Sequence, residues 1–348
     1  MRRVALRKVA ASVGIAAVVV MVTSLLASDG VVNVIHYGGS GGKAMRTAFF
    51  DPAEKEIGIK VQDFSRTDMA KIKAMVQSGK IEWDVANVNT LEVYRGAREG
   101  LWESIDYSVI DRTVTGPAPA LEHGVPFIGF SIGLGYSTKK YPTPAEAPKS
   151  WADFWDVKRF PGGRTLENRV RYQLEFALLA DGVPPDKLYP LDVDRAFRKL
   201  DQIKPHITAW AKPPVQPIEL IASGEVVMAA VFNNEVAEAQ KRGVPIALQW
   251  NQSLYLTNAW SVLKGTPHKK DAMLLIKAMT KPEHEARMAE LTYFGPMNPA
   301  ALPLIKPEVR QHLPTEPENL KKGIPLDNEW WGTNEAKLIE RWNAWLLK

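Results

Sequence analysis

Hydrophobic residues in the first third of the chain form short β-rich runs that alternate with amphipathic helical runs. Strands are expected at 31–36, 57–64 and 83–88, and helices at 68–77 and 90–98. A strand–helix alternation of this kind predicts an α/β fold with right-handed crossovers and a mostly parallel sheet.

The same alternation returns after Tyr136 and continues to the C-terminus. The expected strands lie at 164–166, 226–232, 246–250 and 260–263, and the expected helices at 173–180, 194–203, 217–222, 235–242, 269–280, 282–291 and 334–347. The chain therefore contains two α/β units, with no internal repeat between them.

Two segments are expected to run between these units. Residues 126–136 are β-rich and punctuated by glycine, which indicates a crossing strand, and residues 249–258 are the candidate for the return. The predicted organisation is a first lobe of residues 31–134 with 259–300, a second lobe of residues 135–258, and a C-terminal helical segment, 301–348, that packs on the lobes. Two mixed or parallel sheets flanked by helices then leave a ligand cleft between the lobes.

The N-terminus has the order of a secretory signal peptide. Four basic residues within positions 2–8 precede an apolar run at 9–27, and small and polar residues follow from Ser28. Residues 1–28 are therefore predicted to be an export signal. The apolar run is long enough that an uncleaved membrane anchor stays open as the alternative.

Composition narrows the class of protein further. The chain has 44 Lys and Arg against 39 Asp and Glu, and the four basic residues of the leader account for most of this excess. The remainder is almost neutral, without the basic patch of a nucleic-acid binder. The chain has no cysteine, which excludes disulfides, thiolate metal sites and a lipid-modified cysteine. An exported chain without such a tether is expected in the periplasm.

Two glycine-rich segments, 38–42 and 129–133, match the serine-hydrolase pattern G-x-S-x-G. Ser40 precedes any complete sheet, and the segment around Ser131 continues as a strand, so neither serine is expected to be a nucleophile. Before the helix expected near Lys43, Gly39 and Ser40 are instead assigned to anion binding through exposed backbone N–H groups. A simple tight turn is the alternative.

Cofactor and metal chemistry have no support in the sequence. The six histidines are scattered without i, i+4 partners, so no metal site is predicted. No phosphate-binding loop is present, because Ala44 follows Lys43 where that motif needs Ser or Thr. No cofactor and no catalytic residue are therefore expected.

The most informative polar cluster spans residues 167–172, between an expected strand and an expected helix. Arg169 and Arg171 lie at the start of that helix, where positive charge opposes the helix macrodipole. This unfavourable placement indicates an anionic ligand, with two solvated arginines as the alternative. Asn233 and Asn234 lie at another strand end, where they can cap a helix or contact a ligand.

Several motifs taken in order resemble one known family. They are Lys149–Asp156, Phe160–Gly162, Ser223–Met228, Gly295–Pro299 and Glu329–Trp331. Their order and spacing resemble the periplasmic solute-binding proteins of ABC importers, in the branch that includes the spermidine/putrescine-binding proteins. This resemblance covers nearly the whole chain after the leader.

The resemblance implies the two-lobed periplasmic-binding-protein fold, which closes on its ligand by a hinge motion and docks on a membrane permease. It implies a monomeric binding protein without enzymatic activity, whose ligand contacts come from strand ends. Together with the glycine loop, the expected contacts are Tyr37, Gly39, Ser40, Asn89, Asn168, Arg169, Arg171, Tyr172, Asn233, Asn234, Tyr255, Asn258 and Trp260.

The chain departs from the polyamine-binding pattern at positions where that pattern places carboxylates. Asn168, Arg169 and Arg171 stand at the start of the second lobe, and Asn258 stands in the return crossing. Arginines repel a multiply charged amine, so a carboxylate-bearing or zwitterionic solute is predicted. Polyamine binding is kept as the alternative because other acidic residues remain available.

Overall fold

The computed structural model describes residues 30–212 and 214–348, and the predicted export signal lies outside them. The strands are β1 (Val31–His36), β2 (Lys60–Ser65), β3 (Val85–Asn89), β4 (Val125–Ser137), β5 (Arg164–Glu167), β6 (Ile207–Ala211), β7 (Met228–Phe232), β8 (Ile246–Val262), β9 (Gly295–Pro296) and β10 (Gly323–Pro325). The α-helices are α1 (Gly39–Met45), α2 (Asp51–Ile57), α3 (Met69–Ser78), α4 (Thr90–Arg98), α5 (Trp151–Trp155), α6 (Gln173–Ala180), α7 (Val193–Ile203), α8 (Gln216–Ser223), α9 (Asn233–Lys241), α10 (Lys269–Met279), α11 (Pro282–Thr292), α12 (Pro307–Arg310), α13 (Pro317–Leu320) and α14 (Asn328–Leu346).

The strands form one mixed sheet in the order β2-β1-β3-β8-β4-β7-β5-β6. The parallel strands β1, β2 and β3 make one half and the parallel strands β5, β6 and β7 the other, with β4 and β8 between them. The α/β class is as predicted, but the two expected sheets are joined into one because β4 and β8 hydrogen-bond from one half to the other.

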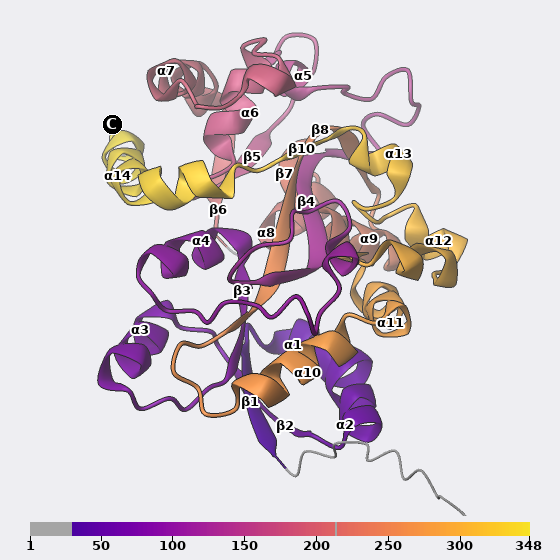
Figure 1. Ribbon diagram of the computed structural model, residues 1–348. Coiled ribbons are helices and arrows are strands. Elements are labelled where there is room, and N and C mark those ends of the chain that lie inside the picture. Colours follow the sequence, from indigo (N-terminus) through magenta and orange to yellow (C-terminus); the bar gives the residue numbers. More distant parts are fainter. Residues whose placement is uncertain (1–29, 213) are drawn as a thin grey trace, which may run out of the picture.

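The two halves are the lobes of the fold. β4 and β8 run antiparallel between the halves, from the pair Val125–Trp260 at one end to Ser137–Ile246 at the other (Figure 1). β10 pairs with the middle of β8 and leads into α14, which makes a third connection. The expected crossing strands are confirmed, whereas the residue bounds of the lobes stay a prediction.

Alternating side chains along the first-lobe strands build two apolar layers. One layer packs on α1, α2 and α10 and contains Val34, Val85 and Trp260. The other packs on α3 and α4 and contains Ile35 and Ala86. Helices thus cover both faces of the sheet, as expected for buried parallel strands.

The C-terminal helix α14 belongs to the core of the second lobe. Trp331, Trp342 and Trp345 project from it into the same apolar cluster as α5, α6 and α7. In Figure 1, α14 lies beside α4 of the first lobe, so it also reaches across to the other half. Large aromatic side chains dominate this packing because each buries 150–250 Å² of surface, roughly.

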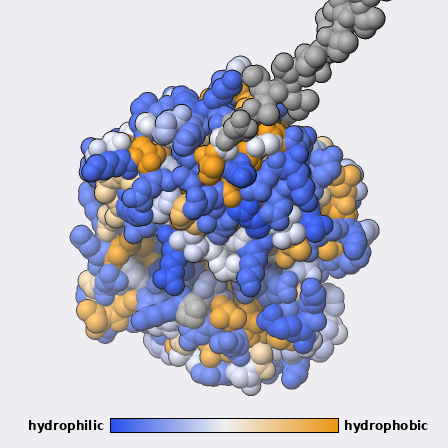
Figure 2. Space-filling view, turned by 90° about the horizontal axis from the view of Figure 1, so that it is seen from below, coloured by the Kyte–Doolittle hydropathy of each residue, from blue (hydrophilic) through white to orange (hydrophobic). Residues whose placement is uncertain are grey.

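The surface has no large apolar face in the view from below the first lobe. Figure 2 shows hydrophilic residues over most of that face, with hydrophobic residues in small separate spots. Within residues 30–212 and 214–348, no helix has the length and apolar character needed to cross a membrane. The same residues contain no cluster of His, Asp and Glu arranged to hold a metal ion.

Two helix starts differ from the sequence prediction by four residues or more. α1 begins at Gly39, four residues before Lys43, because the Gly42 N–H already donates a helical hydrogen bond to Gly38 O at 3.0 Å. Gly42 is required there, since a Cβ atom would lie 2.5 Å from Cε1 of His36. α14 begins at Asn328 and not at 334, because Asp327 caps it.

Candidate functional site

The first-lobe wall of the site lies at the carboxyl ends of β1 and β3. The Tyr37 hydroxyl accepts a hydrogen bond from the backbone N–H of Asn89 at 3.1 Å. The Asn89 side chain caps α4 by accepting from the N–H of Glu92 at 3.1 Å. Tyr37 is 47% exposed, yet burial among surrounding protein atoms raises its pKa. This combination is expected for the wall of a cleft.

The second-lobe wall is the segment between β5 and α6. Arg169 and Arg171 both lie over the ring of Tyr172, with guanidinium carbons 5.9 and 5.6 Å from its centroid. Tyr172 has a φ of 78°, in the left-handed region that non-glycine residues rarely adopt. Backbone strain of this kind persists only where the surrounding structure enforces it, and strained residues are concentrated at functional sites.

The two arginines have different surroundings. Arg169 is 39% exposed and its Nε lies 3.1 Å from Oε2 of the buried Glu167. Arg171 is only 17% exposed, and its Nε lies 3.3 Å from Oε1 of Glu335 on α14. Burial acts to lower the pKa of Arg171, but Tyr172 and Glu335 outweigh it and raise that pKa. Arg171 is therefore a firmly charged group inside the fold.

An ion-pair chain joins this wall to the first lobe. Oε2 of Glu335 lies 2.6 Å from Nη2 of Arg95 on α4, and Nη1 of Arg95 lies 3.2 Å from Oε1 of Glu92. Arg171 and Glu92 also influence the pKa of Tyr37, in opposite directions, so both lie near its hydroxyl. Charged groups of both lobes thus meet around Tyr37.

Like Glu167 and Arg171, Glu92 is a polar group of this cluster with spare bonding capacity. Its Oε2 is buried and has no hydrogen-bond partner within the described residues. Burial raises the pKa of Glu92, while the nearby Arg95 lowers it. A buried carboxylate oxygen without a donor is costly, so a cationic donor from a ligand would stabilise it.

Four other predicted contacts lie in the glycine loop and at strand ends. Gly39 and Ser40 are exposed in the first turn of α1, next to a hollow lined by Lys43 and other residues of that turn. Asn168 accepts a hydrogen bond from the Trp342 indole at 3.2 Å. Asn234 donates to its neighbour Glu235 at 3.2 Å.

Two predicted contacts have structural roles. Trp260 is fully buried and stacks on Phe127 with ring centroids 4.1 Å apart. Asn233 accepts from the Ser131 N–H at 2.8 Å and donates to the carbonyls of Tyr293 and His312 at 2.9 and 3.0 Å. Trp260 therefore packs in the first-lobe core and Asn233 fastens β4 to the C-terminal segment. Neither is included in the site proposed below.

The remaining two predicted contacts lie on the return crossing, β8. Asn258 is buried and pairs with Asn89 in the β3–β8 register, so it lies at the base of the first-lobe wall. The Tyr255 hydroxyl lies 3.2 Å from Sδ of Met297, and its ring lines a separate cavity. Tyr255 and Asn258 differ by an odd number of positions, so they face opposite sides of the strand.

Sequence reasoning missed the acidic half of the cluster. Glu92 and Glu335 are ordinary helix residues in the sequence, and Glu335 meets Arg95 across 240 positions of chain. No local pattern reports such a contact. For Glu92, the one available signal was that Asn89, at the end of β3, can cap the helix that contains Glu92.

Comparison with known proteins identifies the family. Residues 48–315 match the model of the bacterial extracellular solute-binding proteins. The chain is 40% identical over 322 residues to a gamma-aminobutyric acid-binding protein of Pseudomonas aeruginosa, covering 90% of each chain. It is 24% identical over 285 residues to the spermidine/putrescine-binding periplasmic protein of Escherichia coli, covering 77% of this chain and 80% of that protein.

A solved structure described as a GABA receptor superposes on this chain with a TM-score of 0.83 and 35% identity, covering 90% of this chain and 97% of the other. Family match, identity and fold agree with the two-lobed arrangement described above. The chain belongs to the bacterial extracellular solute-binding proteins and is the substrate-binding component of an ABC transporter for a small polar solute.

Proposed function

We propose that the protein captures a zwitterionic amino acid of the γ-aminobutyrate type between its lobes. The supporting observation is the pair Arg169 and Arg171, which lie together over Tyr172 on the second-lobe wall. The printed functions of the 40% identical relative and of the solved receptor, which name gamma-aminobutyric acid and GABA, support the same ligand class.

The carboxylate of the ligand binds at the arginine pair. A guanidinium presents parallel N–H donors that match a carboxylate, and charge-assisted hydrogen bonds are about twice as strong as neutral ones. Arg169 makes the main contact, because it has one ion-pair partner within the described residues and its guanidinium is accessible. Arg171, which forms an ion pair with Glu335, adds to the positive electrostatic potential of the same wall.

The ammonium of the ligand binds at Glu92. One oxygen of that carboxylate has no hydrogen-bond donor, and the charge of Glu92 influences the pKa of both Tyr37 and Arg171. A zwitterion places its two charges against the acidic and basic parts of one cluster, so no charge of the ligand is left buried and unpaired.

A polyamine fits this cluster less well. Each ammonium at about 4 Å from an arginine would be repelled by ~4 kcal/mol at an effective dielectric constant near 20. The relatives named for polyamines have 22–24% identity to this chain, well below the 40% of the gamma-aminobutyric acid binder. Polyamine binding is therefore the second candidate.

The test is calorimetric titration of γ-aminobutyrate into single variants. Arg169→Ala is expected to lose ~2–5 kcal/mol of binding free energy, since the ligand carboxylate would be left unpaired. Glu92→Gln is expected to weaken γ-aminobutyrate but not butyrate, which lacks the amine. Arg341→Ala, which removes an exposed ion pair on α14, is the matched control. Unchanged affinity in both Arg169→Ala and Arg171→Ala would refute the assignment.

We also propose the setting in which this binding takes place. The predicted export signal and the periplasmic relatives support a periplasmic protein that delivers its solute to a membrane permease. The near-neutral chain after the leader supports a protein that binds no nucleic acid, and the family resemblance supports a monomer. Membership in a family of binding proteins supports the absence of enzymatic activity. Mass spectrometry of the mature N-terminus distinguishes a cleaved leader from an anchor.

A further inference from the structure

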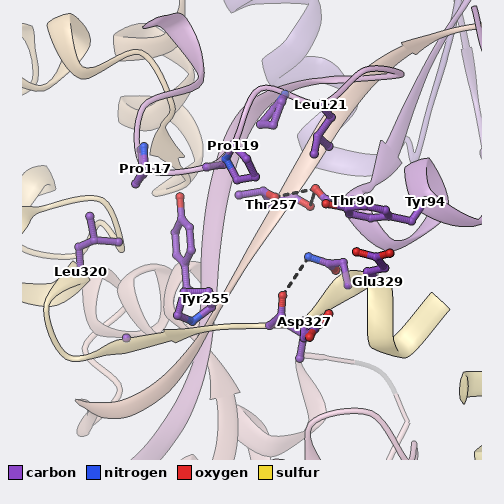
Figure 3. Close-up of a pocket in the computed structure, with 16 residues that line it drawn as sticks. Thr90, Tyr94, Pro117, Pro119, Leu121, Tyr255, Thr257, Leu320, Asp327 and Glu329 are labelled. Atoms are coloured by element: carbon purple, nitrogen blue, oxygen red, sulfur yellow. Dashed lines mark hydrogen bonds between the residues drawn. The ribbon is translucent and has the colours of Figure 1, made fainter. Parts of the chain in front are cut away.

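A cavity of about 450 Å³ lies on the other side of β8 from Asn258. Its walls come from α4, from the loop before β4, from β8 and from residues 320–329, which connect the lobes (Figure 3). Tyr255 and Thr257 line it, and the side chains between and after them face away. The cavity is thus distinct from the cluster around Tyr37 and the arginine pair.

The wall of this cavity is rigid and apolar. Four prolines contribute to it, together with leucines and the rings of two tyrosines. These residues are Pro117, Pro119, Pro126, Pro325, Leu121, Leu320, Leu326, Tyr94 and Tyr255. Proline has no N–H donor and a fixed φ, so this wall offers shape and apolar surface with little polar competition.

The polar groups at one side of the cavity are acidic. Asp327 and Glu329 line it, and the lining contains no Lys, Arg or His. One oxygen of Asp327 caps α14 by accepting from the N–H of Trp330 at 2.8 Å, whereas Glu329 has no ion-pair partner within residues 30–212 and 214–348. Beside its apolar wall, the cavity therefore has two carboxylates without an ion-pair partner among the described residues.

The ring of Tyr94 lies next to these carboxylates (Figure 3). Burial raises the pKa of the Tyr94 hydroxyl, and the charges of Glu329 and Asp327 raise it further, which agrees with their proximity. A cation placed there would meet both carboxylates and the face of an aromatic ring, each of which attracts positive charge.

We propose that this cavity is a second binding site, for a small organic cation that carries an ammonium on an apolar body. The ammonium lies between Glu329, Asp327 and Tyr94, and the apolar body lies against the prolines and Tyr255. The site does not depend on the identity of the solute held between the lobes.

The probe for the test is phenethylammonium, followed by calorimetry and by ligand-observed NMR. Its neutral analogue 2-phenylethanol and the anion 3-phenylpropionate have similar apolar bodies. Binding is expected to follow the order cation, neutral, anion. Glu329→Gln should weaken the cation about fivefold, as expected for one exposed charge pair. Glu340→Gln, an exposed change further along α14, should leave it unchanged.

Further substitutions test whether the probe binds in this cavity. Asp327→Asn keeps a capping side chain, so adding it to Glu329→Gln should weaken the cation further without unfolding α14, which a thermal melt verifies. Arg169→Ala should leave the probe affinity unchanged, and excess γ-aminobutyrate should not displace the probe. Equal affinity for all three probes, no binding at millimolar concentration, insensitivity to Glu329→Gln, or displacement by γ-aminobutyrate would each overturn the proposal.

Discussion

Replacing Glu335 by Gln isolates the charge that ties the two lobes together at the site. In the folded protein this carboxylate lies 3.3 Å from Arg171 and 2.6 Å from Arg95. Its side chain is 11% exposed. The glutamine keeps the size and the polar atoms of the side chain but removes its charge, so packing against α4 is little altered.

The expected loss of stability in Glu335→Gln follows from the burial of the ion pair that it breaks. Breaking a fully buried ion pair from one side costs ~3–5 kcal/mol because a charge is left uncompensated. Arg171 is 17% exposed and keeps Glu92 and Glu175 within electrostatic reach, so about half of that penalty, ~2 kcal/mol, is expected. Arg341→Gln breaks a pair with Asp194 that is exposed on both sides, and should cost less than ~0.5 kcal/mol.

Urea unfolding of the ligand-free protein measures these costs as changes in midpoint at constant slope. Combining Arg95→Ala with Glu335→Gln gives a double-mutant cycle. Because the ion pair between Arg95 and Glu335 is lost in either single variant, the two losses should be less than additive by ~0.5–1 kcal/mol. A Glu335→Gln protein as stable as Arg341→Gln, or strictly additive losses, would refute the reasoning.

Three other predictions concern other parts of the molecule. Burial acts to raise the pKa of Glu103, but hydrogen bonds from Lys269 and a backbone N–H lower it to about 2. Because the pKa of Glu103 is lower in the folded than in the unfolded protein, its pair with Lys269 stabilises the fold above about pH 4.5, and this contribution is lost as pH falls towards 2. In urea unfolding, Glu103→Gln should therefore cost ~1–2 kcal/mol at pH 7 and nothing at pH 2. Trp260→Leu should cost ~2–4 kcal/mol in the same assay and leave γ-aminobutyrate affinity within about twofold, since its ring packs on Phe127; a large loss of affinity without loss of stability would contradict the core placement. Small-angle scattering should show a smaller radius of gyration with saturating ligand than without it, and an unchanged radius would argue against lobe closure.

Local patterns predicted much of the fold because the strands and helices follow their own hydrophobic periods. β1, α4 and α6 begin and end at the predicted residues. β8 was expected in three parts, the strands 246–250 and 260–263 and the return crossing 249–258, and the structure has one continuous strand of 17 residues. The polar residues near Asn251 interrupted its hydrophobic pattern, although pairing with β4 and β10 keeps the backbone extended. β6 was not predicted, because its exposed edge position leaves little periodicity.

The site residues that lie at strand ends could be predicted from the sequence, whereas the others could not. Arg169 and Arg171 stood out because they oppose the dipole of the helix that follows. The packing role of Trp260 depends on α1 and α2 residues more than 200 positions away, as does the contact between Arg95 and Glu335. Such contacts follow from how the lobes pack, and a single sequence carries no local trace of them.

The central claim is that the cleft selects a zwitterion, and calorimetry on the unmodified protein with three ligands of equal chain length tests it most directly. γ-Aminobutyrate has both charges, butyrate has the carboxylate alone, and putrescine has an amine at each end. The account predicts that γ-aminobutyrate binds most tightly, that butyrate binds more weakly because Glu92 stays unpaired, and that putrescine binds weakest because it faces Arg169 and Arg171. Tightest binding by putrescine would contradict the account and favour a polyamine-binding protein.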